Sequence, residues 1–183
     1  MDAYTAPLYE TPDAAKAAGV TQKILQTWLD RHIIEPTLPA HGSGYVHRFS
    51  RNRVMQIAIA FRLWGTGITP REAVDAALTF SDEGGEGRQP GRLFPTGRTV
   101  LVIRGSDMAA VVNVPDGETI EDLVSTGDDA LVSVDLNRLV ESVVPNLVER
   151  RYLPTTFRRQ GERMAEAERN LARMTAHLDA AGA

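Results

Sequence analysis

The sequence contains no cysteine, and this absence removes two classes of structure. Disulfide bonds and metal sites built on thiolates are both excluded. The four histidines do not show metal-ligand spacing, so we predict no metal site. Common catalytic motifs are missing too: there is no Gly-rich phosphate loop, no Gly-x-Ser-x-Gly and no His-Glu-x-x-His. We therefore expect a protein that is not an enzyme and that uses no cofactor.

Long apolar runs are absent as well. The longest nearly apolar stretches, such as residues 54–63, are too short to span a bilayer. The first residues contain neither a basic region nor an apolar region of the kind that forms a secretion signal. Together with the lack of cysteine, these absences predict a soluble, cytoplasmic protein with no membrane partner.

Basic charge is low overall but concentrated in one region. The formal net charge is −4. Between residues 20 and 71, however, seven Lys and Arg residues stand against two Asp and Glu, whereas residues 81–149 are strongly acidic. Salt limits the reach of surface charge to roughly 8–10 Å, so a local basic face can act even on an acidic protein. The first part of the chain is therefore the candidate for binding phosphate groups.

Two short helices are predicted near the start of the chain. Thr11 is expected to cap the first helix, and Gly19 is expected to end it. Thr21 is expected to cap a second helix over residues 22–32. In this helix Trp28 shares an apolar face with the neighbouring Ile and Leu residues, which predicts that it belongs to the core.

The next signals predict a strand and two further helices. A short strand is expected over residues 44–49, after a stretch broken by Pro and Gly. A third helix is expected over residues 50–64, since apolar residues recur there at helical spacing. Thr69 and Glu72 match a capping box, which predicts a fourth helix that extends to about residue 80.

The composition changes after this region. Residues 81–97 contain five Gly and two Pro residues, which favours a linker. Two β-branched runs over 99–104 and 108–114 predict a hairpin, residues 130–134 a third strand, and residues 136–144 a helix.

We therefore expect a mainly α fold with a small α+β module. The predicted domains are an N-terminal helical domain with a short strand over residues 8–80, a linker over 81–97, the α+β module over 98–150, and a long C-terminal helix over 155–181. The module is a candidate for sensing a small-molecule effector or contacting a protein.

The predicted C-terminal helix carries an apolar seam of the coiled-coil type. Its candidate dimerisation residues are Phe157, Met164, Leu171, Met174 and Leu178. The seam could pair with a second copy of the chain or fold back on the α+β module. We favour a homodimer, in which the seam pairs with that of a second copy.

Residues 8–80 resemble the DNA-binding domain of the MerR family. The resemblance rests on Ala15 to Val20, where a helix ends in Ala-x-x-x-Gly-Val, on the next helix with Leu25 and Trp28, and on the apolar pair and proline at 33–36. Gly44-Tyr45 and Arg48-Phe49-Ser50 look like the wing of that family. The sequence departs from the family at Gln26, where arginine is usual, and at Thr27-Trp28, where two aromatic residues are common. The resemblance implies a winged helix-turn-helix that binds double-stranded DNA and regulates transcription.

Candidate DNA contacts follow from how such helices dock. The first residues of a recognition helix reach base edges in the major groove, while wing residues reach the backbone or the minor groove. Basic residues at the start of the third helix oppose its dipole, so an external phosphate would account for them. The candidates are Thr21, Gln22, Lys23, Gln26, Thr27, His41, Ser43, Tyr45, His47, Arg48, Arg51 and Arg53.

Two alternatives remain beside a transcriptional regulator. Phage excisionases and small terminase subunits use a similar winged domain, so the chain could be a DNA-binding part of a mobile element. The domain could instead serve protein interaction alone. The preferred DNA site separates the first alternative from a regulator, and the salt dependence of DNA binding tests the second.

Overall fold

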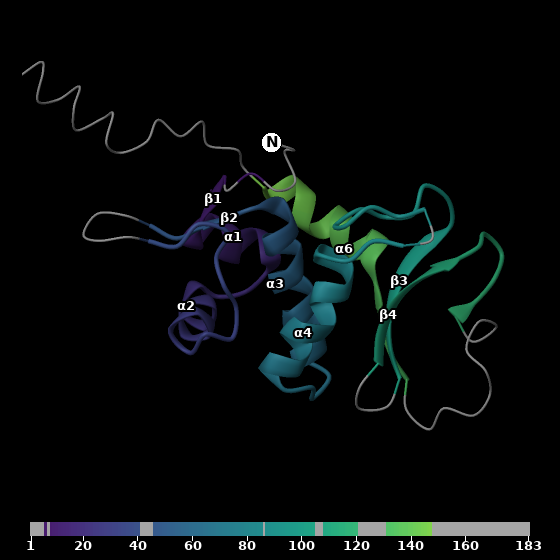
Figure 1. The fold of residues 1–183 in the computed structure, drawn as a ribbon, viewed down its shortest axis with the longest axis horizontal. Coiled ribbons are helices and arrows are strands. Elements are labelled where there is room, and N and C mark those ends of the chain that lie inside the picture. Colours follow the sequence, from purple (N-terminus) through teal and green to yellow (C-terminus); the bar gives the residue numbers. More distant parts are fainter. Residues whose placement is uncertain are drawn as a thin grey trace, which may run out of the picture. The chain divides into compact units, whose positions relative to one another are not determined.

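A computed structural model describes residues 6, 8–40, 46–85, 87–104, 108–120 and 131–147 of the 183-residue chain. These residues combine helices with two small sheets (Figure 1), which confirms the predicted mixture of α and β structure. The C-terminal helix predicted over 155–181 lies outside the described residues. The elements are β1 (Tyr9–Glu10), α1 (Thr11–Ala18), α2 (Gln22–Asp30), β2 (Arg48–Phe49), α3 (Arg51–Trp64), α4 (Pro70–Ser81), β3 (Arg98–Arg104), β4 (Met108–Val114), β5 (Leu131–Asp135), α6 (Leu136–Val143) and the 3-10 helix η1 (Val144–Asn146).

Helices α1 and α2 are joined by a sharp turn whose ends are set by local chemistry. Gly19 adopts a left-handed conformation with φ of 72°, and its N–H contacts the Ala15 and Lys16 carbonyl groups at the end of α1. Thr21 then caps α2 by accepting a hydrogen bond from the Ile24 N–H at 3.2 Å. The predicted roles of Gly19 and Thr21 are confirmed. The second helix, however, ends at Asp30 and not at His32, which has a positive φ of 50°. The prediction that Thr11 caps α1 is wrong. Glu10 occupies the cap position without a side-chain hydrogen bond, and Thr11 is already helical.

Helices α3 and α4 pack against each other and form the centre of the helical part. Most of α3 is buried, including Val54, Ile57 and Leu63, none of which exposes any side-chain surface. Helix α4 begins with the predicted capping box, in which Thr69 and Glu72 each bond the backbone of the other. The expected role of that pattern is confirmed.

The second sheet has the strand order β4-β3-β5 and is antiparallel throughout. Strands β3 and β4 form the predicted hairpin, with Arg98 opposite Val114 and Arg104 opposite Met108. At the end of β5, Asp135 caps α6 by accepting the N–H of Arg138. Strand β4 contacts α4 and β3 contacts α6, and Leu101 joins the same hydrophobic cluster as the residues of α3 and α4.

The segment predicted as a linker, residues 81–97, contains buried side chains. Arg88 and Phe94 expose only 7% and 8% of their surface. Gly91 has φ of 69°, and a Cβ atom there would lie 2.2 Å from the Asn52 Oδ1 atom. The described residues group into one compact unit, to which residues 81–97 belong. The predicted domain boundaries at 80 and 98 stay a prediction.

Candidate nucleic-acid interface

Helix α2 has one anchored face and one exposed face. On the anchored face, Leu25, Trp28 and Leu29 expose 0%, 3% and 7% of their surface. The prediction that Trp28 belongs to the core is thus confirmed; its ring meets that of Trp64 edge-on at 6.0 Å between centroids. The opposite face carries Gln22, Lys23 and Gln26, which are all exposed. In Figure 1, α2 lies on the side of the helices away from β3 and β4. An outside ligand can therefore reach this polar face.

The start of α2 combines positive charge with backbone donors. The N–H groups in the first turn of a helix have no partner within the helix, and they carry the positive end of its dipole. The Thr21 hydroxyl satisfies one of them, the N–H of Ile24. The first-turn N–H groups of Gln22 and Lys23, next to the Lys23 ammonium group, suit an anionic partner such as a phosphate.

Two other polar side chains of α2 contact their own helix. The Gln26 Nε2 atom donates a hydrogen bond to Asp30 Oδ1 at 2.8 Å. The Thr27 hydroxyl donates to the Lys23 carbonyl oxygen at 2.9 Å, and the Thr27 side chain is half-buried. Of these two candidates, Gln26 is the one that projects from the helix.

The strand pair of β1 and β2 lies beside α1, at the place of the predicted wing. Strand β2 pairs with β1, and Arg48 also forms an antiparallel bridge with Leu38. The His47 Nδ1 atom accepts a hydrogen bond from the Ala40 N–H at 3.1 Å, and the side chains of His47 and Arg48 are half-buried. Three candidates between these strands, His41, Ser43 and Tyr45, lie outside the described residues.

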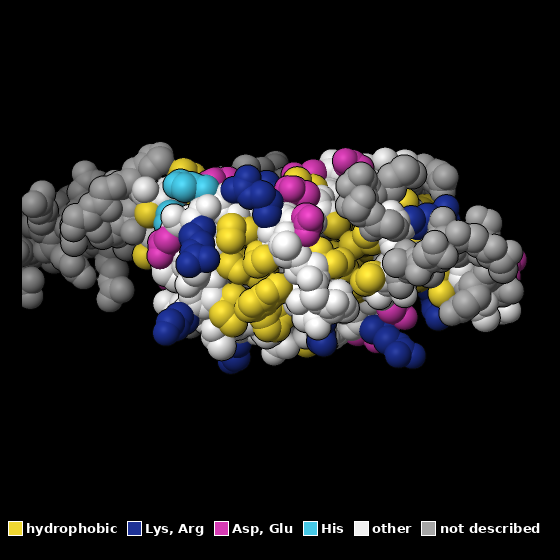
Figure 2. Space-filling view, turned by 90° about the horizontal axis from the view of Figure 1, so that it is seen from below, with side chains coloured by type: hydrophobic (Ala, Val, Ile, Leu, Met, Phe, Trp, Pro, Cys, Tyr) yellow, Lys and Arg dark blue, Asp and Glu magenta, His cyan; other side chains and the backbone are white. Residues whose placement is uncertain are grey.

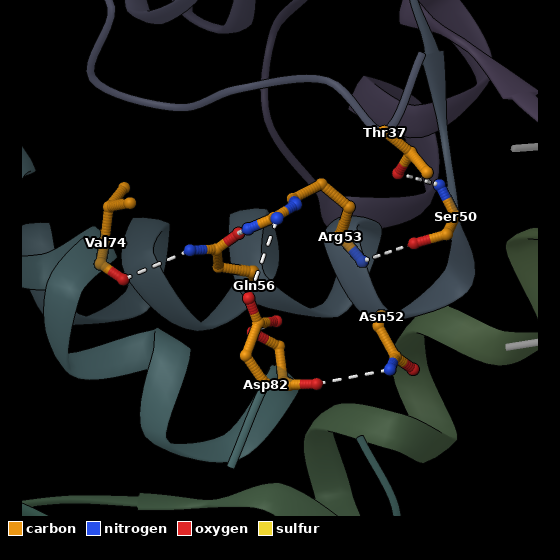
Figure 3. Close-up of polar contacts among 8 residues, drawn as sticks. Thr37, Ser50, Asn52, Arg53, Gln56, Val74 and Asp82 are labelled. Atoms are coloured by element: carbon orange, nitrogen blue, oxygen red, sulfur yellow. Dashed lines mark hydrogen bonds and ion pairs between the residues drawn. The ribbon is translucent and has the colours of Figure 1, made fainter. Parts of the chain in front are cut away.

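Arg53, in the first turn of α3, contacts other residues of the protein, whereas the sequence predicted that it contacts DNA. Arg53 donates to Gln56 Oε1, and its Nη2 atom lies 3.6 Å from Asp82 Oδ2 at the end of α4 (Figure 3). The Gln56 amide in turn donates to the Val74 carbonyl oxygen. These contacts give Arg53 an internal partner of opposite charge, whereas the sequence-based account assigned it to a DNA phosphate. Arg51 at the same helix end is half-buried.

Two further basic residues lie at the far end of α2 and were missing from the predicted site. Arg31 follows the helix directly and is exposed. Arg71, in the first turn of α4, donates to the His32 carbonyl oxygen at 3.4 Å, which places it beside the end of α2. Both residues belong to the excess of Lys and Arg between residues 20 and 71. The sequence did not indicate that Arg71 lies beside α2, because that position depends on how α4 packs. The predicted dimerisation residues lie outside the described part of the chain.

The charges do not merge into one continuous patch on the face that Figure 2 shows. Lys and Arg side chains there are separated by hydrophobic and uncharged ones. Within the described ranges, no group of three or more His, Asp or Glu residues is arranged to hold a metal ion, and no helix is long and apolar enough to cross a membrane. Binding at such a surface would depend on separate, well-placed contacts.

The chain matches no known family in a sequence comparison, and no characterised protein has a sequence that matches it.

Proposed function

We propose that this protein binds double-stranded DNA in a sequence-specific manner, with α2 as the helix that enters the major groove. One observation carries this proposal. The apolar side of α2 is held in the core by Leu25, Trp28 and Leu29, while Gln22, Lys23 and Gln26 stand exposed on the other side. The major groove is about 12 Å wide, which is enough to admit an α-helix together with its side chains.

The neighbouring elements fit a winged helix-turn-helix of the MerR type. Helices α1 and α2 would be the helix pair, because a tight turn through Gly19 and Thr21 joins them. The segment that leads from Leu38 to Arg48 would be the wing, because its two ends are bridged beside β1. In such domains the recognition helix reads bases and the wing contacts the DNA backbone.

The biological role that we propose is a transcriptional regulator that acts as a homodimer. The apolar seam over residues 157–178 would join two copies of the chain, so that two α2 helices read the two halves of one site. The α+β module over 98–150 would receive a small-molecule or protein effector. A symmetric DNA site, recovered with two copies of the protein bound, would support this arrangement.

The backbone contacts of this proposal can be tested at Arg48 and Arg51. We expect the double variant Arg48→Ala/Arg51→Ala to weaken binding to a mixed-sequence duplex and to the preferred site by the same factor. Because each phosphate contact releases counterions, the slope of log K against log salt should also fall by about 0.9 per lost contact. Fluorescence anisotropy at several salt concentrations measures both quantities, and circular dichroism checks that the variant is folded.

The control for this experiment is Arg98→Ala, which removes an exposed arginine from the second sheet. Its salt slope should equal that of the unmodified protein. A flat salt response of the unmodified protein, or no binding to DNA at all, would contradict the proposal and favour the protein-interaction alternative.

A further inference from the structure

We propose that Asp30 fixes the orientation of the Gln26 amide, and that this makes the protein select adenine over guanine at the base pair that Gln26 contacts. The inference rests on the proposed role of α2 as a recognition helix. It adds a positioning residue, Asp30, which does not itself touch a base.

The geometry fixes which end of the amide faces Asp30. Gln26 and Asp30 are one helical turn apart, are both exposed, and are joined by a hydrogen bond of 2.8 Å from Nε2 to Oδ1. An ionised carboxylate accepts hydrogen bonds and cannot donate them. Rotating the amide by half a turn would put Oε1 against the carboxylate, where two acceptors repel each other. The Asp30 carboxylate therefore holds the NH2 end of the Gln26 side chain and turns the carbonyl oxygen away.

This orientation determines which base Gln26 can read. One N–H of the amide is used by Asp30, which leaves the second N–H and the carbonyl oxygen. Adenine presents an acceptor, N7, and a donor, the N6 amino group, in the major groove; guanine presents two acceptors, N7 and O6. The held amide matches adenine, whereas its oxygen would repel O6 of guanine. An amide that can rotate would accept guanine by turning its NH2 group toward O6.

Asp30 is expected to weaken DNA binding while it increases the selectivity for adenine. These two effects have opposite consequences when Asp30 is replaced, so they can be measured separately. It lies in the last turn of α2, where negative charge opposes the helix dipole. It also brings negative charge close to a surface proposed to meet phosphates. Removing the charge should therefore tighten binding to any sequence. A gain in affinity combined with a loss of base selectivity is the signature of the positioning role.

The experiment uses the full-length protein and a site selected from a random duplex library. The base pair that Gln26 contacts is located first. It is the position at which the Gln26→Ala variant discriminates less between bases than the unmodified protein does. Duplexes with A or G at that position are then compared by fluorescence anisotropy. Asp30→Asn keeps the shape of residue 30 but offers both a donor and an acceptor, so Gln26 can bind it in either orientation. We expect Asp30→Asn to lower the preference for A over G by roughly tenfold while overall binding becomes tighter.

Two variants control for charge and for geometry. Asp30→Glu restores a carboxylate within reach of Gln26, so the preference for A should stay close to that of the unmodified protein. Glu35→Gln removes a negative charge from an exposed residue after α2 whose carboxylate contacts His32, so binding should tighten with the preference unchanged. Circular dichroism checks that all four variants, Gln26→Ala included, are folded.

The outcomes separate this inference from the proposed function. If the unmodified protein enriches no sequence from the library, the proposed function and the inference both fail. If it enriches a site, but Asp30→Asn keeps the original preference or the base at the Gln26 position is not adenine, then only the inference is overturned.

Discussion

Replacing Lys23 and Gln26 together by alanine is expected to abolish the preference for a specific DNA site while the protein stays folded. Both side chains are exposed on α2, so their loss removes no core contact. Each good side-chain contact to a base contributes about 1–3 kcal/mol of discrimination. The two together should therefore cost up to about 6 kcal/mol of preference, leaving binding that depends only on phosphate contacts. Competition between the selected site and a scrambled duplex measures this loss.

A matched control removes the same side-chain types elsewhere. Lys16→Ala/Gln89→Ala replaces an exposed lysine on α1 and an exposed glutamine in the segment after α4. This control should keep the full preference for the selected site. If the Lys23/Gln26 double variant discriminates as well as the control does, α2 is not the element that reads the bases.

Replacing Arg88 by methionine is expected to destabilise the fold by about 1–3 kcal/mol for each buried carbonyl group that is left without a partner. The Arg88 guanidinium donates hydrogen bonds of 2.7–3.3 Å to five carbonyl oxygens, those of Thr79, Phe80, Glu83, Gln89 and Arg92. It also lies 5.3 Å from the centre of the Phe80 ring. Methionine fills similar space but donates no hydrogen bond, so buried carbonyl groups lose their partners.

The charge of Arg88 is maintained despite its burial. Burial lowers the pKa of Arg88 below its usual value, while the nearby Glu83 acts in the opposite direction. Arginine still stays protonated in proteins, so the guanidinium keeps all its donors at neutral pH. Urea unfolding measures the loss of stability. The control Arg62→Met, at an exposed position of α3, should change the free energy of unfolding by no more than about 0.5 kcal/mol.

The same unfolding curves test the predicted domain boundaries. Trp28 and Trp64 are the two tryptophans, and both lie within residues 8–80. Tryptophan fluorescence therefore reports on this part alone, whereas far-ultraviolet circular dichroism also reports on the second sheet. Coincident transitions would show that the two parts unfold as one unit, and separate transitions would show independent domains.

A loss of stability from Arg88→Met similar to that from Arg62→Met would contradict the role assigned to Arg88.

Sequence reasoning succeeded where the determining contacts are local. The left-handed Gly19 and the Thr69–Glu72 capping box each involve residues only a few positions apart, so the pattern and the structure coincide. The β3–β4 hairpin likewise follows from two β-branched runs with a short connection. The exposed face of α2 followed from helical spacing, because Trp28 and its apolar neighbours occupy the opposite side.

Contacts between residues distant in the sequence were not predicted. Arg53 meets Asp82, which is 29 positions further along the chain, because α4 returns along α3. The glycines and prolines of residues 81–97 indicate a linker, yet the turns they allow bring backbone carbonyl groups around Arg88. The Gln26–Asp30 pair has the spacing of neighbours on a helix, so it could have been found from sequence.

Selection of bound duplexes from a random library with the purified full-length protein tests the central claim most directly. We expect the protein to enrich a defined sequence, and we expect Lys23→Ala/Gln26→Ala to enrich none while it still binds DNA at low salt. Failure of the unmodified protein to enrich any sequence, or recovery of the same site by the double variant, would contradict base recognition by α2.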